Sequence, residues 1–209
     1  MWIIKLGGSL LGSPELKNWL DALVKFSDGK VVIVPGGGIF ADAVRDAQKL
    51  SNISDVTAHQ LALKAMDQFG LLLAGMNAEL VTASSELEIA ERGWQHRCIV
   101  WLPSQMVLAD DEIPQNWEVT SDSLSAWLAN KLNAKQLILV KSKSLNDYPN
   151  TISVQTLVED GLVDAQFLNF IKGQGYQTQI LNKSDSHLFN HSIDPQHFEQ
   201  FGCNLLMND

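Results

Sequence analysis

One pattern, a strand followed by a glycine-rich turn and a helix, occurs twice within the first fifty residues and constrains the fold most. Trp2-Ile3-Ile4 is apolar, Lys5-Leu6-Gly7-Gly8-Ser9 follows it, and residues 14–26 place their apolar side chains on one helical face. The apolar run Val31-Val32-Ile33-Val34 leads into Gly36-Gly37-Gly38, and helical spacing follows again. This order predicts an α/β fold with a parallel sheet covered by helices.

The two glycine turns are candidate anion sites. Glycines between a strand and a helix allow backbone N–H groups to converge on one point, and such a point binds phosphate. Ligands of parallel sheets bind beyond the carboxyl ends of the strands, so both turns are expected at one edge. Lys5 adds a positive charge beside the first turn. We therefore expect this turn to hold a phosphoryl group during its transfer. The alternative is a tight structural turn with a surface lysine.

Composition excludes several classes of protein. The 209 residues are 45% hydrophobic, which suffices for one core and predicts a single domain over residues 1–209. The net charge of −9 argues against a nucleic-acid surface. Cys98 and Cys203 have no metal-ligand spacing and predict buried thiols in a reducing compartment. The start lacks a signal-peptide pattern, and no run approaches the roughly 18 apolar residues of a membrane span. We expect a cytoplasmic protein that binds neither membrane nor nucleic acid.

The rest of the chain continues the alternation of helices and strands. A long helical stretch over 54–80 is apolar on more than one side, which favours a contact between subunits and hence a homodimer or larger homo-oligomer. Residues 82–93 predict a short polar helix or loop. Residues 103–117 predict a surface excursion whose Asp110-Asp111-Glu112 is a solvated loop or a cation site. Further strands are expected over 98–102, 136–140, 176–181 and, at the edge of the sheet, 204–207.

Asp122 is the candidate carboxylate of the site. It lies in the first turn of a helix that opens at Thr120, near the same sheet edge. There it could orient the lysines or hold the magnesium ion that accompanies a nucleotide. Its other interpretation is a helix-start residue favoured by the dipole alone. Lys141 places a second lysine at a strand end, and His59, early in the long helical stretch, is either a ligand or a structural side chain.

Motifs of other enzyme classes are absent or incomplete in this sequence. The chain has no Gly-x-x-x-x-Gly-Lys-Ser/Thr, which excludes a P-loop enzyme, and its histidines have no zinc spacing. Gly36-x-Gly38-x-x-Ala41 matches the permissive dinucleotide fingerprint, with Asp55 at the distance of the ribose-binding acid. Asp55 opens a helix, however, and the first glycine turn stays unexplained. An NAD-dependent oxidoreductase is therefore the lesser alternative, and it predicts a strand after Ser54.

These segments together resemble the amino acid kinase family, which includes acetylglutamate, uridylate and isopentenyl phosphate kinases. The resemblance covers nearly the whole chain. It implies a three-layer αβα sandwich with a mostly parallel sheet of about eight strands. It also implies ATP as phosphoryl donor, Mg²⁺ with it, and a small phosphate or carboxylate as acceptor. Four segments carry it in order: Lys5-Leu6-Gly7-Gly8-Ser9, Pro35-Gly36-Gly37-Gly38, Thr120-Ser121-Asp122-Ser123-Leu124-Ser125-Ala126 and Ile180-Leu181-Asn182.

The resemblance also implies roles for the candidate residues. Lys5 would stabilise the transferred group, and Asp122 would orient the lysines. ATP would lie over the carboxyl ends of the later strands. The candidates are Lys5, Asp122 and Lys141 for catalysis, Gly7, Gly8, Ser9 and Lys143 for the ATP phosphates, and Gly36, Gly37, Gly38 and His59 for the acceptor.

Two departures from the family pattern bear on activity. Many members follow the strand equivalent to residues 137–140 with Asp-x-Asp-Gly, whereas this chain has Lys141-Ser142-Lys143-Ser144. Many also carry a second catalytic lysine after a glycine-rich turn, where Gly161-Leu162-Val163-Asp164-Ala165 has alanine. Lys141 is the candidate substitute. Without it, the protein would be a nucleotide- or anion-binding protein that has kept the fold and lost the transfer.

The short length and the segment Ala65-Met66-Asp67-Gln68 narrow the resemblance within the family. They look most like the small branch that contains the kinase of methanofuran biosynthesis. This resemblance implies an aminomethylfuran-methyl phosphate as acceptor, which the transfer would convert to a diphosphate.

Overall fold

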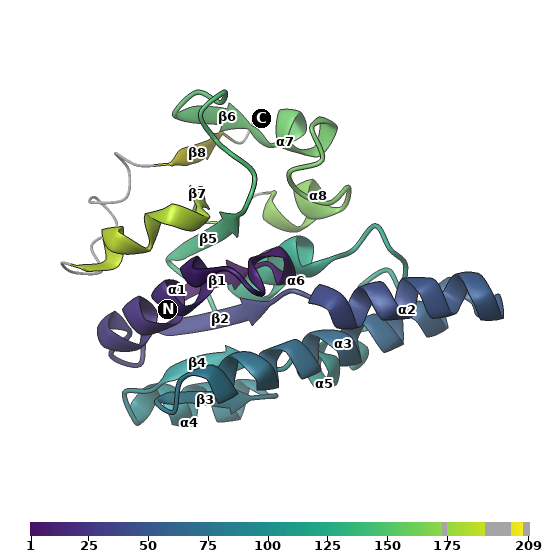
Figure 1. The fold of residues 1–209 in the computed structure, drawn as a ribbon, viewed down its shortest axis with the longest axis horizontal. Helices are drawn as coiled ribbons and strands as arrows, with labels where there is room; N and C mark the ends of the chain where they lie inside the picture. Colours follow the sequence, from purple (N-terminus) through teal and green to yellow (C-terminus); the bar gives the residue numbers. More distant parts are fainter. Residues whose placement is uncertain (173–174, 191–201, 207–209) are drawn as a thin grey trace.

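The computed structural model describes residues 1–172, 175–190 and 202–206 of the chain (Figure 1). Its strands are β1 Trp2–Leu6, β2 Val31–Pro35, β3 Leu80–Ala83, β4 Cys98–Trp101, β5 Gln136–Lys141, β6 Thr151–Ser153, β7 Gln177–Asn182 and β8 Cys203–Leu206. Within these residues they form one eight-stranded sheet in the order β3-β4-β2-β1-β5-β7-β8-β6. All neighbouring strands run parallel except β7 and β8.

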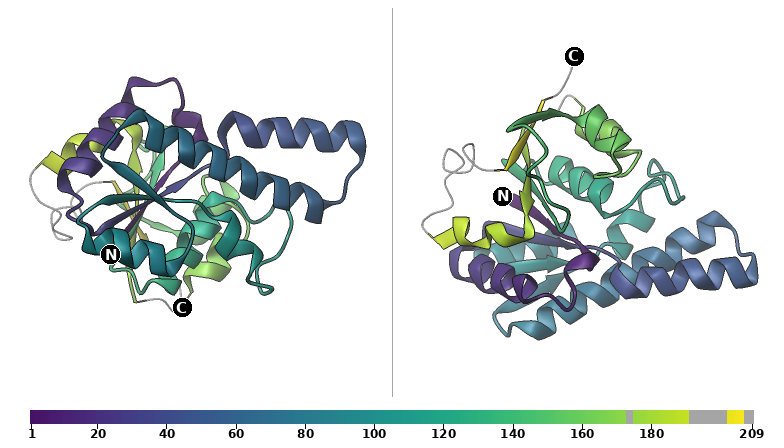
Figure 2. Two further views of the ribbon diagram at one scale, coloured as in Figure 1. Left: turned by 90° about the horizontal axis from the view of Figure 1, so that it is seen from below. Right: turned by 45° about the horizontal axis from the view of Figure 1, so that its top comes forward.

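Helices cover both faces of this sheet (Figure 2). They are α1 Pro14–Phe26, α2 Gly38–Ser51, α3 Asp55–Met76, α4 Glu86–Trp94, α5 Ser104–Leu108, α6 Ser121–Lys131, α7 Val154–Glu159 and α8 Phe167–Ile171, with the short 3₁₀ segments η1 Gly8–Leu10 and η2 Lys183–Asn190. The apolar residues of α1 and η2 pack on one face, and those of α4 to α8 pack on the other. The predicted three-layer αβα sandwich is confirmed.

Alternation along the central strands assigns each side chain to a layer. In β1, Ile3 packs with the α6 layer, whereas Ile4 and Leu6 pack with the α1 layer. Every residue of β1 and β2 is buried, because a central parallel strand has helices on both faces. Lys5 has the parity of Ile3, so its side chain is directed toward the layer that contains α6.

The structure differs from the sequence analysis at three points. The long helix ends at Met76 rather than near residue 80, because the Asn77 side chain accepts a hydrogen bond from the Glu79 amide at 3.0 Å and turns the chain. The strands β3 and β6 were not expected, since four and three residues are too short to show a clear period. The strand expected at 204–207 is not an edge strand, because β8 lies between β7 and β6. Residue 207 lies outside the described residues.

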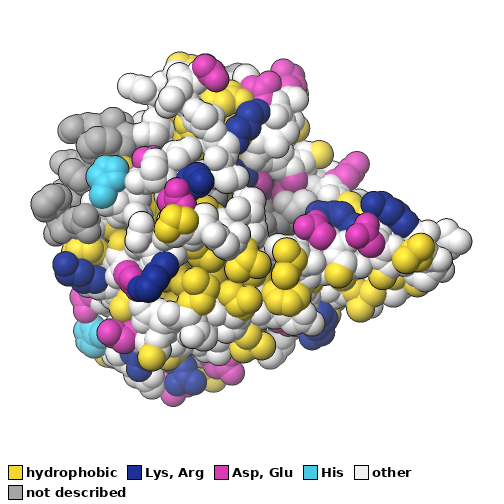
Figure 3. Space-filling view, in the orientation of Figure 1, with side chains coloured by type: hydrophobic (Ala, Val, Ile, Leu, Met, Phe, Trp, Pro, Cys, Tyr) yellow, Lys and Arg dark blue, Asp and Glu magenta, His cyan; other side chains and the backbone are white. Residues whose placement is uncertain are grey.

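The helices α2 and α3 form an antiparallel pair that extends beyond the end of the sheet (Figure 2). One side of α3 is buried through Phe69 and Leu73, yet Leu61 and Leu71 stay 42% and 56% exposed. Figure 3 shows apolar side chains gathered along this helix on the surface. Among the described residues, no helix has both the length and the hydropathy needed to cross a membrane.

Both cysteines are free and buried, as expected. Burial raises the pKa of the Cys98 thiol to about 12, so this side chain behaves as an inert core residue at neutral pH.

Candidate functional site

The two glycine turns meet at the carboxyl ends of β1 and β2, which are neighbours in the sheet. The Gly36 amide donates a hydrogen bond to the Leu6 carbonyl at 2.9 Å. A Cβ atom added to Gly8 would lie 2.2 Å from the Cα atom of Gly38, closer than any side chain tolerates. Only glycine therefore allows this approach, and the expected meeting of the two turns is confirmed.

Lys5, Asp122 and Lys141 form one buried cluster beside these turns. The Lys5 ammonium lies 3.0 Å from Oδ1 of Asp122, and Lys141 donates a hydrogen bond of 2.7 Å to Oδ2. Lys5 and Lys141 come from the adjacent strands β1 and β5, and both are directed toward the layer that holds α6. Asp122 lies in the first turn of α6, so one carboxylate bridges the two cations.

Electrostatics keep Asp122 ionised. Burial alone would raise the pKa of its carboxyl group, but the charges of Lys141 and Lys5 outweigh this effect and lower the pKa to about 2. Burial also lowers the pKa of Lys141, to about 8, although Asp122 opposes that change and Lys5 adds to it. At neutral pH the cluster therefore contains two ammonium groups and one carboxylate, with a net positive charge.

The turn that follows β1 leaves room in front of Lys5. A Cβ atom at Gly7 would lie 3.4 Å from the Lys5 ammonium and 3.5 Å from the Ser9 hydroxyl, so it would occupy the space between these groups. Glycine keeps this space open for a ligand. Backbone amides, a hydroxyl and an ammonium around one small space are suited to phosphate oxygens.

A cavity of about 540 Å³ lies on one side of the glycine turns. Its walls include the apolar side chains of Leu63, Met66 and Leu124, and part of its lining comes from Gly8 and Gly38. Polar and aromatic groups lie elsewhere in the same lining. The Arg45 guanidinium stacks on the Trp117 ring at 4.6 Å and pairs with Asp42 at 2.7 Å. The cavity thus offers an anion site together with an apolar and aromatic wall.

His59 lines the same cavity and is almost fully buried. Its Nδ1 atom lies 3.1 Å from the Asn116 carbonyl oxygen, which can only accept, so Nδ1 carries the hydrogen. Burial lowers the pKa of His59, which favours the neutral ring. Its Nε2 atom is buried without a hydrogen-bond partner among the described residues. The structure thus brings His59 to the cavity, where its ring contacts the Asn116 carbonyl oxygen rather than Lys5 or Lys141.

A second cavity, of about 580 Å³, lies over the carboxyl ends of β5 and β7. Its lining is polar and includes Ser142, Asn150 and Asn182. Ser142 donates a hydrogen bond to the Ser9 hydroxyl at 3.1 Å, so the first glycine turn adjoins this cavity as well as the other one. The turn that follows β1 thus lines the first cavity and is hydrogen-bonded through Ser9 to a residue that lines the second.

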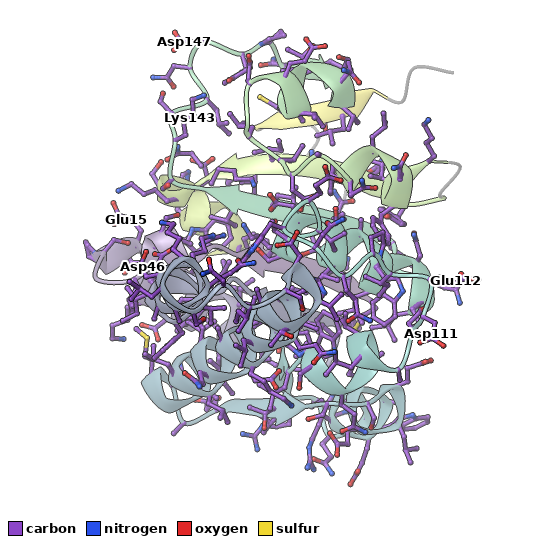
Figure 4. All side chains as sticks on the ribbon, turned by 90° about the vertical axis from the view of Figure 1, so that its right-hand side faces the viewer. Glu15, Asp46, Asp111, Glu112, Lys143 and Asp147 are labelled. Atoms are coloured by element: carbon purple, nitrogen blue, oxygen red, sulfur yellow. The ribbon has the colours of Figure 1, made fainter. Side chains whose placement is uncertain are left out.

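The structure does not bring Lys143 to the other candidates. Its ammonium donates to the Tyr148 hydroxyl at 3.4 Å and lies 5.9 Å from the centre of that ring. Figure 4 shows Lys143 on the exposed loop that also carries Asp147. Its expected contact with ATP phosphates stays a prediction.

Asp164 is a residue of the site that the sequence interpretation missed. Its carboxylate accepts hydrogen bonds from the Thr120 amide at 3.0 Å, the Thr120 hydroxyl at 2.7 Å and the Ser123 amide at 3.0 Å. The Ser123 hydroxyl donates a fourth bond. Thr120 and Ser123 flank Asp122, so Asp164 holds the segment that carries it. The hydroxyl residues around Asp122 were the available signal, but nothing local indicated their partner. Ala165 next to it is exposed.

The acidic run of residues 110–112 does not form a metal site. Asp110 accepts a hydrogen bond from the Trp127 indole at 3.0 Å and another from the Glu112 amide at 3.1 Å. Figure 4 shows Asp111 and Glu112 on the outer surface. Within the described part of the chain, no three His, Cys, Asp or Glu residues are grouped to hold a metal ion.

The dinucleotide-binding alternative fails on its own test. No strand follows Ser54, because helix α3 starts at Asp55. The Asp55 carboxylate accepts a hydrogen bond of 2.8 Å from the Gln48 side chain instead of standing at a strand end. It therefore lacks the position of a ribose-binding acid.

Comparison with solved structures gives the same fold. The uridylate kinase of Archaeoglobus fulgidus superposes with a TM-score of 0.69 at 17% identity, covering 98% of this chain and 99% of that one. A UMP kinase of Bacillus anthracis superposes with a TM-score of 0.67 at 15% identity, covering 98% and 94%. At such identities the likeness concerns the fold alone.

Sequence comparison identifies a relative and the family of the chain. The (5-(aminomethyl)furan-3-yl)methyl phosphate kinase of Methanocaldococcus jannaschii is 35% identical over 141 residues, which make up 66% of this chain and 64% of that enzyme. The match thus spans somewhat less than two thirds of the relative. Residues 1–160, which include both glycine turns and the buried lysine–aspartate cluster, match the amino acid kinase family, and the chain belongs to that family.

Proposed function

We propose that the protein is an ATP-dependent kinase that transfers the γ-phosphoryl group to the phosphate of a small acceptor. The observation that carries the proposal is the carboxylate of Asp122 between the Lys5 and Lys141 ammonium groups, beside two glycine turns in contact. Family membership and the activity named for the M. jannaschii relative support it. Phosphoryl transfer needs the reacting groups in line and their charge neutralised, and this cluster provides cations for that purpose.

In the transfer, an oxygen of the acceptor phosphate forms a bond to the γ-phosphorus of ATP. The bond from that phosphorus to the bridging oxygen breaks, and ADP leaves with the electron pair. A phosphate monoester is largely dianionic at neutral pH, so its attacking oxygen carries no proton that a base must remove. This agrees with a site whose buried groups are two lysines and an ionised aspartate. Lys5 and Lys141 would stabilise the charge on the moving group.

The cavity lined by Trp117 and Leu124 is the proposed acceptor site. Gly36, Gly37 and Gly38 would contact the acceptor phosphate, and His59 would line the part of the site farther along α3. An apolar wall beside an anion site suits a phosphate attached to a small ring. An aminomethylfuran-methyl phosphate, the type of acceptor named for the M. jannaschii relative, has this composition.

The polar cavity over β5 and β7 is the proposed nucleotide site, with Gly7, Gly8 and Ser9 at its phosphate end and Lys143 on the adjacent loop. Both oxygens of Asp122 are held by lysines, and the described residues offer no cluster for a metal ion. Mg²⁺ would therefore be carried by the nucleotide phosphates, whose charge it neutralises. This arrangement does not require a dedicated protein metal site.

The test is ADP release from ATP and Mg²⁺ with a panel of small phosphates that includes an aminomethylfuran-methyl phosphate. Lys5→Ala should lower kcat/KM by at least 100-fold, because it removes a charge that stabilises the transition state. Lys17→Ala, on the exposed face of α1, is the matched control and should retain full activity. Binding of ATP without ADP release for any acceptor would favour the alternative of a nucleotide-binding protein without transferase activity.

We further propose that the protein is cytoplasmic and that it forms a homodimer through α3. Leu61, Leu71 and Met76 on this helix are 42%, 56% and 40% exposed, more apolar surface than one surface helix needs. Light scattering should give twice the mass of the chain, and Leu71→Lys should return the protein to a monomer. A monomeric wild type at micromolar concentration would refute this part.

A further inference from the structure

Asp164 lies in the segment between α7 and α8, 44 residues after Thr120 and 41 after Ser123, the two residues that it holds. Its carboxylate accepts two bonds from Thr120, at 3.0 and 2.7 Å, and two from Ser123, one of which comes from the amide at 3.0 Å. A carboxylate that accepts four bonds is firmly held, and so are its donors. These four bonds join the segment between α7 and α8 to the start of α6.

The start of α6 depends on this carboxylate because the helix lacks a cap of its own. Thr120 occupies the N-cap position, but its side chain makes no capping bond to the helix. Its hydroxyl donates to Asp164 instead, and the carboxylate also takes the Ser123 amide that a capping side chain would normally satisfy. The first turn of α6 is thus fixed by a residue of another segment.

Asp122 lies between the two residues that Asp164 holds. A shift of this turn would change both ion pairs of Asp122, at 3.0 Å to Lys5 and 2.7 Å to Lys141. The charged groups that act on Lys141 are Lys5 from β1, Asp122 from α6 and Asp164. The negative charge of Asp164 raises the pKa of Lys141 and so opposes the effects of burial and of Lys5.

We propose that Asp164 is a positioning residue for the phosphoryl transfer. It holds the first turn of α6 so that Asp122 stays between Lys5 and Lys141. This inference rests on the proposed kinase function, because the position of the two cations matters only if they act on a phosphoryl group. Asp164 acts through Asp122 and Lys141 and need not touch the substrate.

The kinetic test compares Asp164→Asn with Asp67→Asn. Asp67 is a matched control, because its carboxylate likewise accepts bonds from the amide and hydroxyl of Ser104 at the start of α5. Asp164→Asn should lower kcat about tenfold while the KM of the acceptor changes less than twofold, and the alkaline limb of the kcat profile should move to lower pH. Asp67→Asn should lower the melting temperature by about as much as Asp164→Asn does. It should leave kcat, the KM of the acceptor and the alkaline limb of the kcat profile unchanged.

A direct readout does not depend on activity. The pKa of Lys141 is measured in the free protein by NMR titration of ¹³Cε-labelled lysine, with the resonance assigned by its loss in Lys141→Arg. We expect a lower pKa in Asp164→Asn. If that variant does not fold, Ser123→Ala, which removes one donor to Asp164, should lower both the pKa and kcat in the same direction.

The outcomes separate the two proposals. A wild-type protein that releases no ADP with any acceptor refutes the kinase function, even if the pKa of Lys141 responds to Asp164→Asn. An active wild type in which Lys141 has the same pKa with and without the Asp164 charge overturns the positioning role. If the single variants Ser123→Ala and Asp164→Asn both keep the full wild-type kcat, the positioning role is overturned as well.

Discussion

The substitution Asp122→Asn tests the centre of the site through both stability and activity. In the folded protein the pKa of Asp122 falls from 3.8 to about 2. At about 1.4 kcal/mol per pKa unit, the ionised carboxylate stabilises the fold by about 2 kcal/mol. Because the folded pKa lies below the unfolded one, this contribution is present above about pH 4 and is lost as pH falls toward 2.

Asp122→Asn has no such titration, so its stability relative to wild type depends on pH in a defined way. Urea unfolding followed by tryptophan fluorescence should show the largest gap in unfolding free energy at pH 7, and the gap should shrink by about 2 kcal/mol between pH 4 and pH 2. The rate of ADP release at pH 7 should fall about 100-fold, because two buried ammonium groups lose their common partner.

The control for this experiment is Asp21→Asn, which removes an exposed carboxylate paired with Lys17 at 2.5 Å. Surface ion pairs contribute less than about 1 kcal/mol, so this variant should stay close to wild type at every pH. A gap between wild type and Asp122→Asn that is equal at pH 7 and pH 3 would refute the electrostatic argument. Full activity of Asp122→Asn would leave Asp122 as a helix-start residue.

Two further substitutions test the turns and the cavity. Gly8→Ala should abolish ADP release and lower the melting temperature, since its Cβ atom would lie 2.2 Å from Gly38, whereas Gly75→Ala in α3 meets no atom within 4 Å and should be neutral or stabilising. An active, stable Gly8→Ala protein would show that the two turns need not touch. Trp117→Ala should raise the KM of the acceptor about tenfold and leave that of ATP unchanged, and Trp94→Ala, at a side chain 86% exposed, should alter neither. Equal changes in both KM values for Trp117→Ala would remove this ring from the acceptor site.

Local sequence was enough to predict the central part of the fold. The helix over 14–26 was bounded correctly, because Pro14 suits a first helical position and the apolar residues behind it repeat with helical spacing. The strands β1, β2, β4 and β5 each contain a continuous run of at least three apolar residues, which is typical of strands buried on both faces of a sheet. Glycines directly after two such strands predicted the contact between the turns.

The sequence also determined which side chains approach the glycine turns, because strand ends and helix starts meet at one edge of a parallel sheet. Lys5, Asp122 and Lys141 were predicted from these positions, and the structure joins them with ion pairs of 3.0 and 2.7 Å. The direction of a side chain that lies beyond a strand end is less constrained, because the sheet no longer fixes which way it points. Lys143, two residues after Lys141, therefore pairs with Tyr148 instead.

Tertiary structure alone decided the features that join distant segments. The strands β3 and β6 and the place of β8 depend on pairing with other strands, since such short segments carry no period of their own. The carbonyl of Asn116 that selects the tautomer of His59 lies 57 residues away in the chain. Asp164 holds a helix that starts 43 residues earlier, because buried N–H and hydroxyl groups need an acceptor and the fold brings the Asp164 carboxylate to them. Local pattern specifies the elements, whereas the partners of buried polar groups emerge only when the elements pack.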